Sequence, residues 1–115
     1  MEKTKCIIKR PDEEYGHEAE IGTTLEDLQR EVDGPIETVT LFDGLGRKKL
    51  LLICNKEGKM KGLDFNFVYF LSDGAFGLID KIVGTAIIIG AAGEELCDIP
   101  ISFNDWKEIL SAWGN

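Results

Sequence analysis

The segment from Val32 to Asn66 contains a helix stop, two strand-like runs and two turn signals in close succession. Asp33-Gly34-Pro35 ends a preceding helix, because Gly34 can take the left-handed conformation and proline cannot continue the helix. β-Branched and apolar residues fill two runs, 36–42 and 49–54, and the second is apolar almost throughout, as in a strand covered on both faces. Asp43-Gly44 predicts a two-residue hairpin turn between the runs, and Gly46 leaves a longer loop as the alternative. The five residues after Cys54 predict a second turn, with a positive φ at Gly58.

Two amphipathic helices are predicted, one before this segment and one at the end of the chain. Thr23 and Thr24 each precede an acid by the spacing of a capping box. Leu25, Leu28 and Val32 then form one apolar stripe at helical spacing. In the closing helix, which Ser102 to Asp105 open, the apolar face consists of Phe103, Trp106, Leu110 and Trp113. We expect the closing helix to be part of the core.

The whole chain, residues 1–115, predicts a single α+β domain with a mostly antiparallel sheet and two main helices. A strand pair, a crossing helix and a second strand pair suggest a β-grasp-like start. The segment 64–83 is the most ambiguous: its FNFVYFL sequence predicts a short helix, with a buried strand as the alternative, and 72–77 predicts a loop. Further strands are predicted at 4–10, 18–21, 83–90 and 96–101.

Charge and hydropathy exclude several classes of protein. The 115 residues carry 21 acids and 13 bases, a formal net charge of −8, so direct binding to DNA or RNA is not expected. No apolar run approaches the ~20 residues that a membrane-spanning helix needs. The charged N-terminal sequence MEKTKCIIKRP is unlike a signal peptide. We therefore expect a cytoplasmic protein that makes no membrane contact.

No residue pattern predicts catalysis, a metal or a cofactor. The single histidine, His17, has no serine or cysteine close in sequence with which to form a recognisable dyad. The glycine-rich stretches lack the spacing of a phosphate-binding loop. Cys6, Cys54 and Cys97 lack the paired spacing of a zinc site and are expected to be reduced packing residues. We therefore expect a protein that is not an enzyme.

An acidic run in the N-terminal third is the first candidate site. From Met1 to Glu37 there are eleven acids and five bases (11 − 5, net −6). Such a run is usually a solvated face. The alternative is that it binds a basic surface of a partner protein by charge complementarity. The residues predicted for this contact are Asp12, Glu13, Glu14, Glu18 and Glu20.

A basic run is the second candidate site. Residues 47–61 contain six bases and a single acid, Glu57. Strand alternation places Lys48 away from its two basic neighbours, which leaves four bases able to form one patch for a phosphate beside aromatic residues. Ordinary edge-protecting lysines explain the same pattern without a ligand. The residues predicted for an anionic ligand are Arg47, Lys49, Lys59, Lys61, Phe65, Asn66 and Tyr69.

Three motifs of the chain resemble those of an uncharacterised family. The stretches Asp33–Glu37, Asn55–Lys59 and Gly62–Asn66 are similar to the motifs V-D-G-x-I-E, N-E-x-G-K and G-L-x-x-N of a small domain. Phages, plasmids and conjugative elements of Gram-positive bacteria carry this domain, which has no established activity. The present chain departs from the second motif, because it reads Asn-Lys-Glu-Gly-Lys, with Lys56 between the asparagine and the glutamate. The resemblance implies an accessory protein of a mobile element that acts in the bacterial cytoplasm.

Two functional hypotheses follow. In the first, a non-enzymatic accessory protein binds a host protein through its acidic surface and inhibits a defence system. In the second, the basic face sequesters a small anionic ligand such as a signalling nucleotide. A homo-oligomer is compatible with both, since an exposed edge strand invites symmetric pairing.

Overall fold

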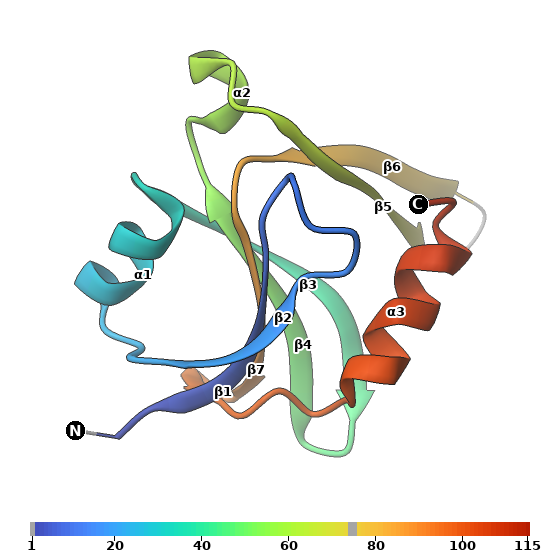
Figure 1. Cartoon of the computed structure of the whole chain (residues 1–115). Coiled ribbons are helices and arrows are strands. Elements are labelled where there is room, and N and C mark those ends of the chain that lie inside the picture. The colour runs from blue at the N-terminus through green and yellow to red at the C-terminus, as the bar shows by residue number, and fades with distance from the viewer. Residues whose placement is uncertain (1, 74–75) are drawn as a thin grey trace.

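The computed structural model describes residues 2–73 and 76–115. Its elements are β1 (Thr4–Lys9), β2 (His17–Ile21), α1 (Leu25–Val32), β3 (Ile36–Leu45), β4 (Lys48–Asn55), α2 (Gly58–Lys61), β5 (Phe65–Asp73), β6 (Phe76–Val83), β7 (Ala86–Ala92), β8 (Glu95–Cys97) and α3 (Phe103–Ala112). In this part of the chain, six strands form an antiparallel sheet in the order β2-β1-β7-β4-β3, with β8 also beside β7 (Figure 1). β5 and β6 form a separate hairpin. The predicted α+β class, with a mostly antiparallel sheet, is confirmed.

The central strand is β7, in which residues 86–91 are all buried. It pairs with β1 through Ile7 opposite Ile88, and with β4 through Leu52 opposite Ile88. The predicted start, a strand pair, a helix and a second strand pair, is present as β1–β2, α1 and β3–β4, and β7 lies between the two pairs in the sheet. Helices cover both faces of the sheet, and this explains why the central strand is apolar throughout rather than alternating.

Each face of the sheet carries its own core. On one face, α3 and the β5–β6 hairpin supply Phe67 and Trp106, whose ring centroids are 5.7 Å apart in an edge-to-face arrangement. Trp106 is fully buried, so the closing helix is part of the core, as predicted. On the other face, α1 packs through Leu28 and Val32, whereas Leu25 is exposed and does not extend the predicted stripe.

The end of α1 shows why a glycine follows it. Thr24 caps the start of the helix, where its Oγ1 accepts from the Asp27 amide at 3.1 Å. At the other end, Asp33 takes the left-handed conformation, with φ 61°, and not Gly34 as predicted. A Cβ at position 34 would lie 2.6 Å from Nδ2 of Asn55, so glycine is required there for space.

The first hairpin turn lies later in the chain than predicted. Leu45 pairs with Lys48, so Gly46 and Arg47 form the turn, and the prediction of a turn at Asp43-Gly44 is wrong. β3 contains two register shifts, and the second, between Phe42 and Leu45, accommodates Asp43-Gly44 inside the strand. Gly46 has the positive φ, 69°, that a tight hairpin turn of this kind uses.

The structure differs most from prediction between β4 and β7. The second predicted turn is present at Lys56 and Glu57, but Gly58 begins α2 without the predicted positive φ, which belongs to Gly62 (69°) at the end of that helix. Met60 of α2 is exposed. The short helix predicted for FNFVYFL is also wrong: this segment belongs to β5, which sends Phe67 and Tyr69 into the core at strand spacing. The loop predicted at 72–77 is wrong for residues 72–73 and 76–77, which pair as the ends of β5 and β6, and the rest of it lies outside the described residues.

The last predicted strand is shorter than expected, because β8 ends at Cys97. The chain then crosses the start of β1, where the Ile99 amide donates to Lys5 O at 2.9 Å. Ser102 and Asp105 form a capping box that begins α3, as predicted. Among the described residues, no helix combines the length and the apolar character required to cross a membrane.

Candidate functional site

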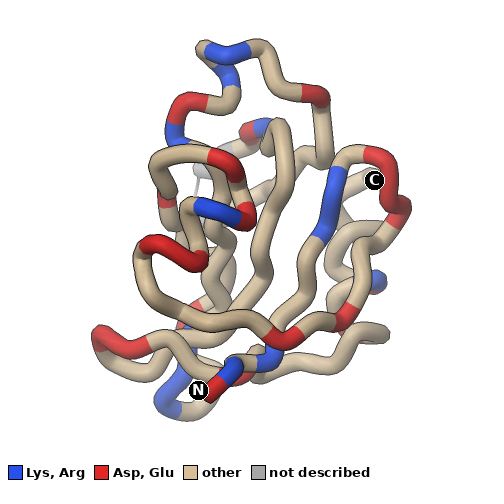
Figure 2. Tube along the Cα trace, turned by 60° about the vertical axis from the view of Figure 1, so that its left-hand side comes forward, with Lys and Arg blue, Asp and Glu red and all other residues tan. Residues whose placement is uncertain are grey.

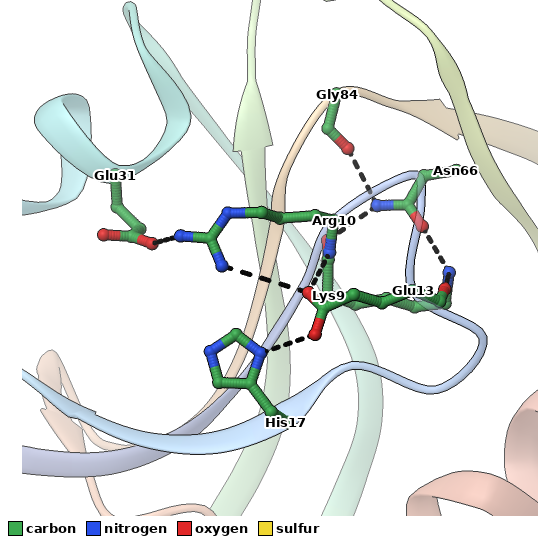
Figure 3. A network of polar contacts seen from close by, with 7 residues as sticks. All are labelled: Lys9, Arg10, Glu13, His17, Glu31, Asn66 and Gly84. Carbon is green, nitrogen blue, oxygen red and sulfur yellow. Dashed lines mark hydrogen bonds and ion pairs between the residues drawn. The ribbon is translucent and has the colours of Figure 1, made fainter.

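A buried lysine connects the tip of the β1–β2 hairpin to the rest of the molecule. Lys9 is 3% exposed, and its Nζ donates to Glu13 O at 2.7 Å and to Asn66 Oδ1 at 2.6 Å (Figure 3). Nδ2 of Asn66 donates in turn to Lys9 O at 2.7 Å and to Gly84 O at 2.8 Å. Burial lowers the pKa of Lys9, while Glu13 and Asp12 oppose that shift. Asn66, predicted as a ligand-binding residue, is therefore buried and occupied by contacts within the fold.

A second network, centred on Glu13, lies at the surface of the same hairpin. One carboxylate oxygen of Glu13 accepts from the Arg10 amide at 3.0 Å, and the other lies 2.7 Å from Nδ1 of His17. Arg10 also forms an ion pair with Glu31 of α1 at 3.0 Å (Figure 3). Partial burial opposes ionisation of Glu13, but the hydrogen bonds from Arg10 and His17 outweigh it and lower the pKa of Glu13. Glu13 thus orders the hairpin and differs from the other four acids predicted with it.

Those four acids are exposed. Asp12 and Glu14 lie in the hairpin loop, and Glu18 and Glu20 lie on β2. Within residues 2–73 and 76–115, none of the four forms an ion pair. The same ranges contain no group of three histidine, cysteine or acidic side chains placed to hold a metal ion. The hairpin therefore presents unpaired negative charge on a well-ordered frame.

A groove of about 760 Å³ lies beside Glu18 and Glu20. In the β1–β2 ladder, Glu18 is opposite Ile7 and Glu20 is opposite Lys5, so both carboxylates share the sheet face that carries Ile7. The segment that leads into α3 forms the other wall. The groove combines an apolar floor with charges of both signs, and its main lining residues are Lys3, Lys5, Ile7, Glu18, Glu20, Ile99, Ile101 and Phe103.

The four bases predicted to form one patch do not come together. Arg47 lies in the turn before β4 and Lys49 near its start, whereas Lys59 and Lys61 lie in α2, beyond its far end (Figure 1). Figure 2 shows the basic residues at separate places along the trace. At ~3.3 Å per residue, β4 separates the two pairs by roughly 20 Å. Lys61 lies 3.6 Å from Glu57 within α2. The predicted four-charge patch is therefore wrong.

Two of the predicted ligand-binding residues, Lys59 and Tyr69, do line one small pocket of about 110 Å³. Lys59 Nζ donates to Asp80 Oδ1 at 2.6 Å, and this hydrogen bond raises the pKa of Lys59 and lowers that of Asp80. Burial raises the pKa of Tyr69, so its hydroxyl is protonated at neutral pH. Phe65, predicted to stack on a ligand, is 55% exposed and is not among the residues that line this pocket. The pocket is well below the ~300 Å³ at which sites for drug-sized ligands begin.

The residues that carry the sequence motifs mostly make structural contacts. Nδ2 of Asn55 donates to the last carbonyls of α1 at 3.2 and 3.1 Å, and its Oδ1 accepts from the Glu57 amide at 2.8 Å. A Cβ at Gly58 would lie 2.9 Å from the side chain of Val83. Asn66 holds Lys9 as described above. The motifs therefore reflect how the segments of the fold are joined, and they do not outline a set of reacting groups.

Comparison with known proteins gives a family but no activity. A family model described as a domain of unknown function, DUF3846, matches residues 4–110. This range extends from the start of β1 through most of α3, so it includes the six-stranded sheet and the separate β5–β6 hairpin. No curated protein and no solved structure matches the chain. The chain therefore belongs to the DUF3846 family of domains of unknown function.

Proposed function

We propose that this protein is a non-enzymatic accessory protein of a phage or other mobile element, and that it binds a host protein in the bacterial cytoplasm. The contact surface is the acidic β1–β2 hairpin, and inhibition of a defence system is the proposed consequence. The observation that carries the proposal is the set of unpaired, exposed carboxylates on this one hairpin, at Asp12, Glu14, Glu18 and Glu20. The mobile-element setting rests on the resemblance of the three sequence motifs.

The way the hairpin is held supports this role. Lys9 and Asn66 attach its tip to β5, and Glu13 and Arg10 attach its loop to α1. A contact surface that is ordered before binding loses less conformational entropy on association. Unpaired surface charges also steer a complementary partner, which raises the association rate at low salt.

The proposal is tested by affinity capture of the tagged protein from a bacterial host, followed by native mass spectrometry. We expect a stoichiometric partner that is lost on charge reversal to lysine at Asp12, Glu14, Glu18 and Glu20. The matched control reverses four exposed acids elsewhere on the molecule, Asp64, Glu94, Glu95 and Glu108. Partner recovery that falls equally with both variants would contradict a contact at the hairpin, because net charge alone would then explain the loss.

A second candidate function is binding of a compact anion in the pocket beside Lys59. Its lining also includes Lys56 and Lys81, so three lysines line the pocket against two acids, Glu37 and Asp80. The pocket's small volume favours a compact anion such as phosphate over a signalling nucleotide, the ligand named in the second functional hypothesis. Calorimetric titration with inorganic phosphate, with Lys59→Met as the comparison, tests this reading, and heats that are equal for the two proteins would contradict it.

A further inference from the structure

β2 is a regular edge strand of the six-stranded sheet. In the described part of the chain it pairs only with β1, in continuous register from His17 to Ile21. The opposite edge, β3, contains two register shifts. Register shifts, prolines and covering loops are the usual means of preventing an edge from pairing with another strand. β2 contains neither a shift nor a proline, so its backbone is a template for a further strand.

The outward backbone groups of β2 belong to Glu18 and Glu20. Lys5 uses its backbone groups on the side away from β2: its amide donates to Asp98 Oδ1 at 2.9 Å, and its carbonyl accepts from the Ile99 amide at 2.9 Å. Glu20 lies directly opposite Lys5. In an antiparallel ladder, opposite residues point their N–H and C=O groups either both inward or both outward. Glu20 and, by alternation, Glu18 therefore present these groups to solvent at the sheet edge.

The side chains of the same two residues face the groove. A strand added to β2 would lie about 4.8 Å away, and its alternate side chains would stand beside the two carboxylates. Lysine or arginine at those positions would neutralise Glu18 and Glu20. Their aliphatic stems would pack on the apolar floor near Ile101 and Phe103, since long basic side chains bury the stem and keep the charged head in water.

We propose that β2 binds an extended, basic segment of a partner protein by strand addition, with lysine or arginine at the alternate positions that face the groove. This rests on the proposed function and specifies the partner's chemistry. A second copy of the chain is a poorer occupant, because antiparallel pairing of two β2 strands centred on Ala19 would place Glu18 of one copy opposite Glu20 of the other. Like charges directly opposite each other destabilise a strand pair.

The probe is a short peptide of alternating lysine and valine, which places every lysine on one face when extended. A peptide of the same composition with its lysines in one block is the control. NMR-detected hydrogen exchange on the full chain should show the amides of Glu18 and Glu20 exchanging about tenfold more slowly with the alternating peptide. Charge reversal at both residues should weaken binding by about tenfold or more, and reversal at Glu94 and Glu95 by less than about twofold.

A pair of substitutions at position 20 separates strand addition from simple charge attraction. Glu20→Gln removes the carboxylate and keeps the outward N–H, whereas Glu20→Pro removes both. Proline is tolerated at edge positions whose N–H faces solvent, so the β1–β2 ladder keeps its hydrogen bonds. Strand addition predicts that the proline variant binds about fivefold more weakly than the glutamine variant. The unfolding midpoint of each free variant shows whether the fold is retained, and the exchange experiment on the unmodified protein does not depend on that outcome.

Three results would overturn the proposal. These are equal affinity for the alternating and block peptides, equal affinity of the two position-20 variants, and protection of Glu18 and Glu20 in a peptide-free dimer, which would identify a second copy as the occupant. Failure of strand addition can be distinguished from failure of the proposed function. If partner capture depends on the hairpin acids while the peptide gives no protection, the partner contact stands and strand addition is wrong.

Discussion

Two lysine contacts of the same length connect different parts of this molecule. Lys9 Nζ lies 2.6 Å from Asn66 Oδ1 in a buried site, and Lys59 Nζ lies 2.6 Å from Asp80 Oδ1 at the surface. The exposed pair has opposite charges, but water and ions screen it, and such pairs contribute little. The buried lysine has only neutral acceptors, yet removing any partner leaves a polar group without one. Burial, and not charge complementarity, therefore decides which contact stabilises the fold.

The largest effect is expected for Asn66→Ala. This change leaves the Lys9 ammonium without one of its two acceptors and removes the donor to the carbonyls of Lys9 and Gly84. We expect the free energy of unfolding to fall by about 3–5 kcal/mol, as when one partner of a buried charge is lost. Urea denaturation measures it. A loss below about 1 kcal/mol would mean that water replaces the amide and that the site is less enclosed than its exposure indicates.

Lys9→Met should cost less, because the methionine fills similar space and removes the buried charge together with its two hydrogen bonds. We expect a loss of about 1–3 kcal/mol from the acceptors left at Glu13 O and Asn66 Oδ1. Combining it with Asn66→Ala should give less than the sum of the single losses by at least about 0.5 kcal/mol. Strict additivity in that double-mutant cycle would show that the two residues act independently.

A smaller effect is expected from pH. Because burial lowers the pKa of Lys9 below its ordinary value of 10.5, the folded state holds its proton less tightly than the unfolded state does. Stability therefore rises with pH as Lys9 loses its proton in the folded protein, up to 10.5, where the unfolded chain also loses it. A neutral amine still supplies N–H donors to both acceptors. The wild type should gain stability relative to Lys9→Met on approaching pH 10.5, and a parallel pH profile for the two proteins would oppose this account.

The smallest effect is expected for Lys59→Met, the matched change in the exposed pair. The side chains of Lys59 and Asp80 are 53% and 41% exposed. We expect a loss of at most about 0.5 kcal/mol that disappears at high salt. If this substitution destabilised the protein as much as Lys9→Met does, the contrast between the two contacts would be invalid.

The sequence predicts those parts of the fold that depend on local signals. The caps at Thr24 and Ser102, the stripe of Leu28 and Val32, and the continuous apolar run of β7 all act within a few residues. The alternative of a buried strand for FNFVYFL is the correct one, since Phe67 and Tyr69 are buried and Phe70 is exposed. The sequence does not show this alternation, because Val68 and Phe70 are apolar as well. Aromatic residues suit either structure, and packing against α3 decided between them.

The positions of the turns were harder to predict from the sequence, because several glycines that could form a turn lie close together. Asp43-Gly44 is a strong hairpin signal, but the register of Leu45 with Lys48 moves the turn to Gly46. Gly58 was predicted to adopt a positive φ in a turn. Glycine is needed there instead because a Cβ would lie 2.9 Å from the side chain of Val83, on a strand distant in sequence. A single sequence does not contain that information locally.

At the candidate site, the five acids were proposed from composition alone, and composition did not distinguish Glu13 from the others. Its role depends on Arg10, His17 and Glu31, which the hairpin and α1 bring together. Lys9 was missed although a signal existed. It has the same strand parity as Ile7 and therefore points to the same buried face. The basic patch prediction failed because the chain directly after Asn55 forms α2 and does not return beside β4 as a strand.

The two buried cysteines, Cys6 and Cys54, can report local opening of the strands that contain them. Burial raises the pKa of Cys6 to about 12, with Glu31 adding to the shift, and raises that of Cys54 to about 11. Thiols with such values remain protonated and do not react with alkylating reagents until the surrounding segment opens. The alkylation rate at Cys6 thus measures how often β1 separates from its neighbours, and the rate at Cys54 does the same for β4. The unmodified sequence therefore contains two thiols whose alkylation rates report local opening, one in each of the strands that flank β7.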